Sequence, residues 1–313
     1  MTNETLIIGS RGSALALWQS NYIKSQLEQI HSELAVDIRI IQTEGDKILD
    51  TPLSKIGGKG LFTKTLEDKL LDGTIDLAVH SLKDLPTILP EGLMLSAVSS
   101  REDPRDVLIS NGLSLTDMPN GATIATGSLR RQSQLLNYRP DFNIRDLRGN
   151  VPTRIDKFNN SDWDGMLLAR AGLKRLGLLD AATEELSFDI ILPAVGQGAL
   201  GLETRQRDFQ VSAILAPLND ADTQVSTAAE RAFLRTLEGG CQVPIGAYGE
   251  VIDGELHFRG YVGSLDGQQA VRGTLHGSPD NAETLGTQLA NQLRHEGAEA
   301  ILEQVRESLE ADD

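Results

Sequence analysis

The chain contains a single cysteine, Cys241, and the residues around it are typical of a loop. Gly239 and Gly240 precede it, and Pro244 follows three residues later. A lone buried cysteine is usually a small apolar filler. Glycine and proline at this spacing instead predict a turn that presents the thiol. A presented thiol is a candidate nucleophile, although no histidine lies near Cys241 in the sequence.

Basic and hydroxyl side chains follow four predicted strands, at 5–9, 75–81, 122–126 and 143–147. These side chains are Arg11, Ser13, Ser81, Lys83, Ser128, Arg130, Arg131, Arg148 and Arg154. In α/β folds, ligands bind beyond the carboxyl ends of the strands. Guanidinium groups bind carboxylates or phosphates through two parallel hydrogen bonds. The group as a whole therefore predicts a pocket for a small polyanion, although any one of these residues taken alone fits an ordinary helix surface.

Asp84 is a carboxylate among those cations, in the run Lys83-Asp84-Leu85-Pro86. One interpretation is a structural ion-pair partner for a neighbouring lysine or arginine. The other is an acid/base group that stabilises a developing positive charge. The pattern alone leaves both interpretations open.

Two familiar signals carry little weight. The run GQGALG (196–201) fits G-x-G-x-x-G, but no clear βαβ unit surrounds it, so a nucleotide site is not expected. The five histidines are dispersed along the chain, and we predict no metal site from them. His80, within the apolar segment 75–81, is expected to be a core histidine.

Composition limits the possible classes of protein. A length of 313 residues favours two or three domains. The net charge of −16 argues against nucleic acid and against an anionic membrane as partners. No apolar run approaches the ~18 residues of a membrane span, and the first residues do not resemble a signal peptide. One cysteine forms no internal disulfide, so we expect a cytoplasmic protein.

The expected fold class is α/β. Strands alternate with helices over the first two thirds, which predicts two α/β domains with mainly parallel sheets. The glycine-rich and polar segment 43–60 is a candidate mobile lid. After a helix at 222–238, Asp253-Gly254 and Asp266-Gly267 separate three alternating segments, which predicts an antiparallel three-stranded sheet. A helix from about 280 to 308 is expected to close this smaller α+β domain.

Nine segments together resemble one known family, that of porphobilinogen deaminase (hydroxymethylbilane synthase). They are RGSALALWQ (11–19), GDKILDTPLSKIGGKGLFTKTLE (45–67), DLAVHSLKDLP (76–86), REDPRD (101–106), SLRRQ (128–132), LRGNVPTR (147–154), AGLKRLG (171–177), LPAVGQGALGLE (192–203) and EGGCQVPIGAY (238–248). The resemblance runs from residue 5 to about 262 in the family's order.

The resemblance implies a fold and a reaction. The fold comprises two domains like those of solute-binding proteins, at 1–99 with 200–217 and at 100–199, and a smaller third domain at 218–313. The reaction is a transferase step of tetrapyrrole (haem-type) biosynthesis, in which four porphobilinogens are condensed head to tail with loss of ammonia. The product, hydroxymethylbilane, is released by hydrolysis. The family acts as a monomer, and its primer is a dipyrromethane cofactor joined to the protein by a thioether, which the motif places on Cys241.

The same resemblance implies roles for individual residues. Asp84 would face the pyrrole N–H groups, stabilise the azafulvenium formed as ammonia leaves, and assist proton transfer. Phe62 would stack near the reacting pyrrole, and Lys55 and Lys59 would act from the lid. The carboxylates of cofactor, substrate and growing chain would be bound by Arg11, Lys83, Ser128, Arg130, Arg131, Arg148, Arg154 and Arg175. The remaining expected binding residues are Ser13, Ser81, Thr126, Gly149 and Gln197.

Two other classes of protein compete with this interpretation. A solute-binding protein would bind carboxylates reversibly and would give Cys241 and Asp84 no role. A thiol hydrolase would need a histidine close to Cys241 in space. The mass of the intact protein separates all three classes, because only the deaminase carries a covalent dipyrrole.

Overall fold

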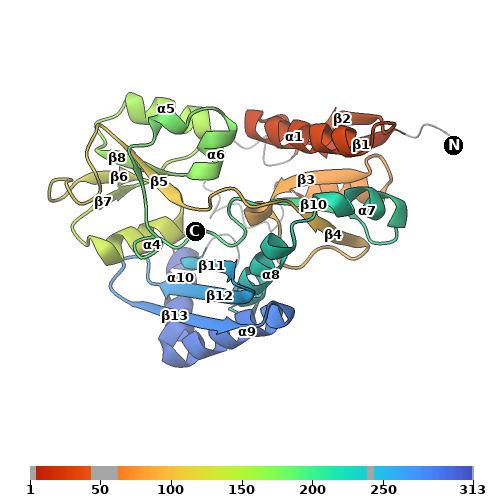
Figure 1. Cartoon of the computed structure of the whole chain (residues 1–313). Coiled ribbons are helices and arrows are strands. Elements are labelled where there is room, and N and C mark those ends of the chain that lie inside the picture. The colour runs from red at the N-terminus through yellow and green to blue at the C-terminus, as the bar shows by residue number, and fades with distance from the viewer. Residues whose placement is uncertain (1–4, 44–62, 238–242, 312–313) are drawn as a thin grey trace. The chain divides into compact units, whose positions relative to one another are not determined.

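The computed structural model describes residues 5–43, 63–237 and 243–311 (Figure 1). Its contacts divide the chain into two compact units. The first unit is Met1–Glu102 with Gly198–Gln224, and the second is Asp103–Gln197 with Val225–Asp313. The predicted lid, except for residue 43, and Cys241 lie outside the described residues.

The first unit contains a five-stranded sheet with the order β2-β1-β3-β10-β4. Its strands are β1 (Leu6–Ser10), β2 (Val36–Ile40), β3 (Leu77–Ser81), β4 (Leu93–Val98) and β10 (Leu200–Arg205). Its helices are α1 (Ala14–Ile30), α3 (Lys64–Leu71), α7 (Phe209–Leu215) and the 3₁₀ turns η1 (Leu82–Asp84) and η3 (Ala216–Leu218). Strand β1 is parallel to both its neighbours, whereas β10 is antiparallel to β3 and β4. Four strands therefore run in one direction, and β10 opposes them.

Helices cover both faces of this sheet. Ile23 and Leu27 of α1 pack with Ile8 in one apolar cluster, whereas Leu66 and Leu70 of α3 belong to another. All five side chains are almost completely buried. Burial of each such side chain contributes about 1.5–3 kcal/mol, so the helices hold the sheet, and the ends of its strands, in fixed positions.

The second unit begins with a sheet of closely similar arrangement, ordered β7-β6-β8-β5-β9. Its strands are β5 (Asp106–Ser110), β6 (Thr123–Ala125), β7 (Asn143–Arg145), β8 (Gly165–Ala169) and β9 (Glu184–Glu185). Its helices are α4 (Leu129–Tyr138), α5 (Val151–Asn159), α6 (Arg170–Arg175) and the 3₁₀ turn η2 (Leu179–Ala181). Strand β6 is parallel to β7 and β8, and β5 is antiparallel to β8 and β9. The expectation of mainly parallel sheets is confirmed, with one opposed strand in each.

The same unit ends in a three-stranded antiparallel sheet, β11-β12-β13. Its elements are α8 (Ala221–Thr236), β11 (Ile245–Ile252), β12 (Glu255–Gly263), β13 (Ala270–Gly277), η4 (Pro279–Asn281), α9 (Ala282–Leu293), the π segment η5 (Arg294–Ala298) and α10 (Glu299–Ala311). Figure 1 shows α9 and α10 beside this sheet, and side chains of α8, α9, α10 and the strands form one core. The predicted three-stranded sheet is confirmed.

The prediction of one helix from about 280 to 308 was wrong. Gly297 has a φ of +115°, which ends α9 in a kink before α10 begins. Glycine adopts such a backbone conformation without the steric cost of a Cβ atom. The apolar period continues across the kink, and for that reason the sequence pattern alone did not reveal it.

The three domain boundaries expected from the sequence stay a prediction. The structure itself places β10 in the sheet of the first unit, next to β3 and β4. Within the described ranges, no helix combines the length and the apolar character that crossing a membrane requires.

Candidate active site

A pocket in the first unit brings together four residues that the sequence analysis selected: Arg11, Ser13, Ser81 and Asp84. The first two follow β1, and the other two lie at the end of β3 and in η1. Because β1 and β3 are parallel neighbours, their carboxyl ends lie at one edge of the sheet. The pocket volume is about 70 Å³, well below the ~300 Å³ of a small-molecule site. The residues that line it therefore enclose less space than a whole small-molecule ligand occupies.

Local hydrogen bonds fix the walls of this pocket. Ser13 is the N-cap of α1, and its Oγ accepts a hydrogen bond from the backbone N–H of Ala16 at 3.3 Å. Gln19 of α1 donates from Nε2 to Oγ of Ser81 at 2.7 Å, which ties the helix to the end of β3. Asp84 is exposed, and Lys83 beside it in the same 3₁₀ turn is half-buried. The turn thus presents the carboxylate of Asp84 to solvent.

A buried acid–imidazole pair lies against the pocket. His80 lines the pocket, and its Nε2 is 2.9 Å from Oε2 of the fully buried Glu203 on β10. The prediction of a core histidine is confirmed, but this histidine also borders the candidate site. Glu203 was not predicted as a site residue, because it lies 123 positions from His80 and only the pairing of β3 with β10 brings the two residues together.

Glu67 of α3 is a second buried acid close to this pair. Burial raises the pKa of Glu67, and the negative charge of Glu203 adds to that rise. Glu67 and Glu203 each have one carboxyl oxygen without a hydrogen-bond partner among the described residues. Acidic groups are thus concentrated behind the pocket, where little water reaches them.

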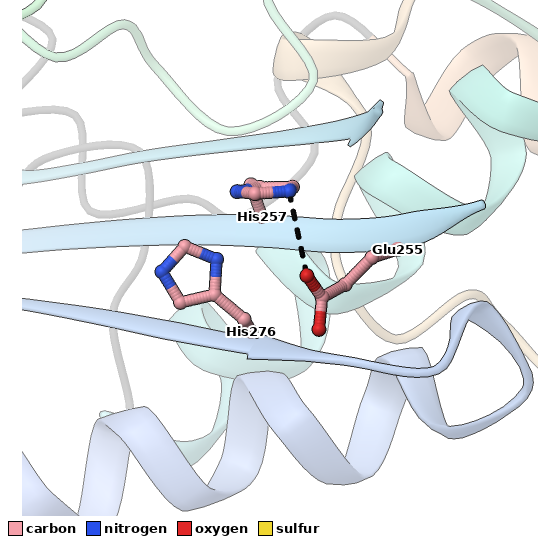
Figure 2. A group of neighbouring side chains, drawn as sticks. All are labelled: Glu255, His257 and His276. Carbon is pink, nitrogen blue, oxygen red and sulfur yellow. Dashed lines mark ion pairs between the residues drawn. The ribbon is translucent and has the colours of Figure 1, made fainter. Parts of the chain in front are cut away.

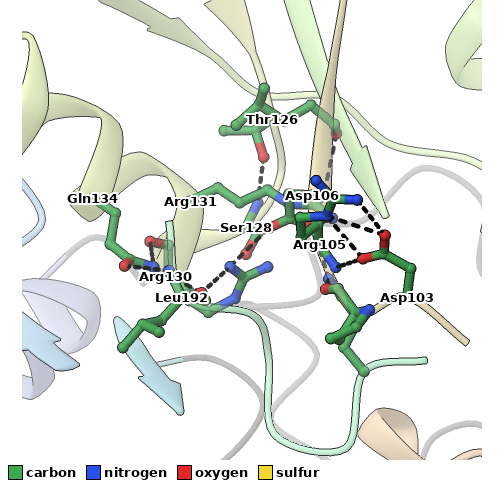
Figure 3. Close-up of polar contacts among 12 residues, drawn as sticks. Asp103, Arg105, Asp106, Thr126, Ser128, Arg130, Arg131, Gln134 and Leu192 are labelled. Carbon is green, nitrogen blue, oxygen red and sulfur yellow. Dashed lines mark hydrogen bonds and ion pairs between the residues drawn. The ribbon is translucent and has the colours of Figure 1, made fainter. Parts of the chain in front are cut away.

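The second unit holds an arginine cluster at the start of α4 (Figure 3). Arg130 Nη1 lies 2.8 Å from Asp106 Oδ2, and Arg131 Nη2 lies 2.7 Å from Asp106 Oδ1. Arg130 also donates to the carbonyl of Leu192 at 2.6 Å, and Arg131 donates to that of Leu167 at 3.0 Å. Both guanidinium groups, expected at a ligand, are buried and paired with Asp106, the first residue of β5.

Asp106 is the centre of this cluster. Burial alone raises the pKa of its carboxyl, but the guanidinium groups of Arg130 and Arg131 outweigh burial and hold the pKa well below its ordinary range. Gln197, another expected binding residue, donates from Nε2 to Asp106 Oδ1 at 2.9 Å and to the carbonyl of Pro104 at 2.7 Å. Three residues predicted to contact a ligand therefore share one carboxylate as their anchor.

The start of α4 lacks a side-chain cap and lies beside a buried arginine donor. Arg131 Nε is buried and has no hydrogen-bond partner among the described residues. Ser128 is the N-cap of α4, yet its side chain makes no capping hydrogen bond, while Thr126 Oγ1 accepts from the backbone N–H of Ser128 at 3.2 Å. The N-terminus of a helix favours negative charge. The start of α4 therefore offers N–H groups and a positive field to a carboxylate.

The residues that follow β7 form local contacts of their own. Arg148 Nε donates to Asp146 Oδ2 at 2.9 Å, and Arg154 Nε donates to the carbonyl of Gly149 at 2.7 Å. Gly149 has a φ of +115°, in the region that favours glycine. Arg175 is the last residue of α6, at the end of the helix that follows β8. These residues line the start of α5 and the end of α6.

Four expected site residues fall outside the described residues: Lys55, Lys59, Phe62 and Cys241. The structure therefore brings together Arg11, Ser13, Ser81 and Asp84 in one unit, and Arg130, Arg131 and Gln197 in the other. Asp106, Glu203 and Glu67 are the additional polar residues that sequence reasoning missed. All three lie in runs quoted for the family resemblance (45–67, 101–106 and 192–203), which gave none of them a role.

The fold and these two groups of residues define the class of protein: a mixed α/β protein with polar side chains, three of them arginines, gathered near the carboxyl ends of its strands. Two family models match the chain. "Porphobilinogen deaminase, dipyromethane cofactor binding domain" matches residues 6–213, and "Porphobilinogen deaminase, C-terminal domain" matches residues 225–295. The chain belongs to the porphobilinogen deaminase family.

Similar proteins cover almost the whole chain. The porphobilinogen deaminase of Carboxydothermus hydrogenoformans is 53% identical over 302 residues, which are 96% of this chain and 97% of that protein. Those of Syntrophotalea carbinolica and Chlorobium phaeobacteroides are 52% and 51% identical, over 96% and 97% of this chain and 96% and 98% of theirs. The resemblance found in the sequence motifs is confirmed.

Among solved structures, the chain is similar to the periplasmic aliphatic sulphonate binding protein SsuA of Escherichia coli. The TM-score is 0.39 at 14% identity, with 75% of this chain and 71% of that chain covered. The fold class stated above follows from the chain's own sheets.

Proposed function

We propose that this protein is a transferase that condenses four porphobilinogen molecules head to tail, releasing ammonia and finally hydroxymethylbilane. Membership of the porphobilinogen deaminase family, at about half identity over nearly the full length, supports the reaction. The observation that carries the proposal to individual residues is the pocket that unites Arg11, Ser81 and Asp84.

Asp84 is the proposed catalytic residue. Its exposed carboxylate accepts hydrogen bonds from pyrrole N–H groups and stabilises the positive charge that develops as ammonia leaves. It also takes part in proton transfer at the reacting carbon. Arg11, in the same pocket, binds a carboxylate of the substrate. Asp84 thus binds the pyrrole N–H of porphobilinogen, and Arg11 binds one of its carboxylates.

The residues of the second unit fit a dipyrromethane, whose side chains are carboxylates. Two donors are of the kind that such acids need: the buried Nε–H of Arg131, which has no partner in the part of the chain that the structure describes, and the start of α4 at Ser128, whose side chain makes no capping hydrogen bond. When bound through Cys241, the dipyrromethane supplies the primer to which pyrrole units are added. We propose that Ser128, Arg130, Arg131, Arg148 and Arg154 bind its acidic groups, and that Lys83 and Arg175 bind those of the growing chain.

The other expected residues have supporting roles in this proposal. Ser13, Ser81, Thr126, Gly149 and Gln197 orient the backbone and cations around the ligand. Lys55, Lys59 and Phe62 act from the predicted lid at 43–60. We also propose that the protein works as a monomer in the cytoplasm, which is supported by the family resemblance and by a single cysteine that suits a reducing compartment.

Mass spectrometry of the intact, natively purified protein tests the proposal. The mass should exceed the sequence mass by that of a dipyrrole, and Cys241→Ser should remove the increment together with porphobilinogen consumption. A protein that carries no increment and leaves porphobilinogen unconsumed would overturn the proposed function. Light scattering of the same preparation measures the molar mass in solution, which should be that of one chain if the protein is a monomer.

A further inference from the structure

Three side chains of the types that can ligate a metal ion lie close together on the three-stranded sheet of the second unit (Figure 2). Glu255 and His257 are two residues apart on β12, so their side chains leave the same face of the strand. His276 on β13 is the register partner directly opposite His257. The antiparallel pairing of β12 with β13 thus places two imidazoles and one carboxylate side by side.

The ligand atoms of these three residues lie close to one another. One ligand atom of each residue lies within 4.8 Å of the others. His257 Nε2 is 3.7 Å from Glu255 Oε2, and the two imidazole centroids are 4.4 Å apart with their planes at 84°. In a tetrahedral zinc site, ligand atoms at the usual bond lengths lie about 3.4 Å from one another. Small side-chain rotations are therefore sufficient to bring the three atoms onto one ion.

The site lies on the accessible face of the sheet. Leu256 and Phe258 alternate with His257 along β12 and are completely buried in the core with α9. Glu255 and His276 are exposed, and His257 is half-buried. Because these side chains do not pack in the core, rotation of the three ligands costs little packing energy.

The charges around the cluster favour a cation. Glu250 on β11 is the register partner of His257 on its other side, which adds a second carboxylate to the same face. Arg259, two residues from His257 on β12, places a positive charge on this face, and its Nη1 lies 3.5 Å from Asp189 Oδ1. The acidic neighbours thus offset the arginine.

We propose that Glu255, His257 and His276 form a binding site for one Zn²⁺ ion. Imidazole nitrogens and a carboxylate oxygen are a donor set that zinc prefers, and three protein ligands leave a fourth position for water. The ion joins β12 to β13, an edge strand, and stabilises the sheet by binding only its folded form. This site is separate from the proposed chemistry of porphobilinogen and does not depend on it.

A competition titration tests the site on the full-length, untagged protein after metal removal by a chelator. Zn²⁺ is added in the presence of a fluorescent zinc indicator, and the protein should withdraw one equivalent. His257→Gln and His276→Gln should each weaken the affinity by at least about tenfold. His295→Gln, which changes an exposed histidine of the same unit outside the cluster, is the matched control and should bind as the unchanged protein does.

A second measurement keeps the test independent of the affinity value. Zn²⁺ should raise the unfolding temperature of the unchanged protein and of His295→Gln but not that of His276→Gln. Circular dichroism verifies that each variant is folded. Three results would each overturn the proposal. The first is equal zinc affinity in the unchanged protein and in His276→Gln, and the second is a loss of zinc affinity in His295→Gln as large as that in His276→Gln. The third is that the protein withdraws no zinc from the indicator.

Discussion

Arg130 and Asp106 form a buried ion pair, with Nη1 of the arginine 2.8 Å from Oδ2 of the aspartate. Arg131 and Gln197 bind the other carboxyl oxygen of the same aspartate. Arginines predicted to hold the acids of a ligand are thus themselves held by an internal acid. The finding assigns to Asp106 the task of orienting these side chains, and it makes the stability of the second unit depend on that carboxylate.

Asp106→Asn should destabilise the protein by about 3–5 kcal/mol at neutral pH, because it leaves two buried guanidinium groups without their counter-charge. Denaturant-induced unfolding, followed by circular dichroism, measures the loss. Asp141→Asn is the matched control, since it removes the acid from the Arg139–Asp141 pair, which is partly open to solvent, and should have a much smaller effect. Similar losses in the two variants would contradict a special role for Asp106.

The same carboxylate gives stability a defined dependence on pH. The pKa of Asp106 is lowered in the folded state, so its contribution is present above the pKa of the unfolded chain, about 4. It is lost as the pH falls from there through the lower folded pKa. The unfolding free energy of Asp106→Asn should therefore fall less steeply below pH about 4 than that of the unchanged protein. If the unfolding free energies of the two proteins fell equally steeply below pH about 4, this assignment would be contradicted.

Asp84→Asn should lower the turnover of porphobilinogen by about 10²-fold or more, because it removes the carboxylate proposed to act on the reacting pyrrole. The mass increment of the bound dipyrrole should remain, since Asp84 is exposed and does not support the core. Glu91→Gln, which neutralises another exposed acid of the first unit, should leave turnover unchanged. Nearly normal turnover in Asp84→Asn would exclude this residue from the mechanism.

Glu67→Gln should raise the free energy of unfolding at neutral pH, because it removes a carboxylate whose charged form burial disfavours. Burial raises the pKa of Glu67, so the folded state retains a proton that the unfolded chain releases. Stability therefore falls as the pH rises from the unfolded value, about 4.3, through the raised folded value. The gain from Glu67→Gln should appear across that window and vanish below it. Asp68→Asn, at the exposed neighbouring position, should give no such gain, and a gain that persists at low pH would refute the explanation.

Gly198→Ala, in the first unit, should destabilise the protein more than Gly112→Ala, in the second unit. Both glycines have φ near +90°, where an alanine is strained. At Gly198 an added Cβ would also meet the carbonyl oxygen of Glu102, whereas nothing lies within 4 Å of a Cβ at Gly112. The difference in unfolding free energy should be about 1–3 kcal/mol. Equal losses in the two variants would show that the close approach relaxes without cost.

The local elements of this protein follow from local patterns. Ser13 begins α1 as its N-cap, and Asn150 with Pro152 begins α5. Asp253 and Gly254 have the positive φ values of a tight hairpin turn, as that dipeptide predicts. Strands β5 and β10 were not predicted, because short apolar segments have no period that separates a strand from a helix.

The candidate site was only partly predictable. Sequence placed Arg11, Ser81 and Asp84 at strand ends, and parallel strands bring such ends together at one edge. Nothing in the sequence indicated that Arg130 pairs with Asp106 rather than with a ligand, because a guanidinium group binds the carboxylate of either one. The burial of the Arg130–Arg131–Asp106 cluster depends on how helices pack on the sheet, and local sequence patterns do not predict that packing.

The sequence by itself determined the family, the proposed attachment residue Cys241 and those helices and strands that have a clear local signal, because each rests on neighbouring residues or short motifs. The tertiary structure alone decided which distant side chains meet: His80 with Glu203, and His257 with His276. The physical reason is that these contacts are set by strand pairing and register. Register depends on the packing of whole sheets against their helices rather than on any local stretch of residues.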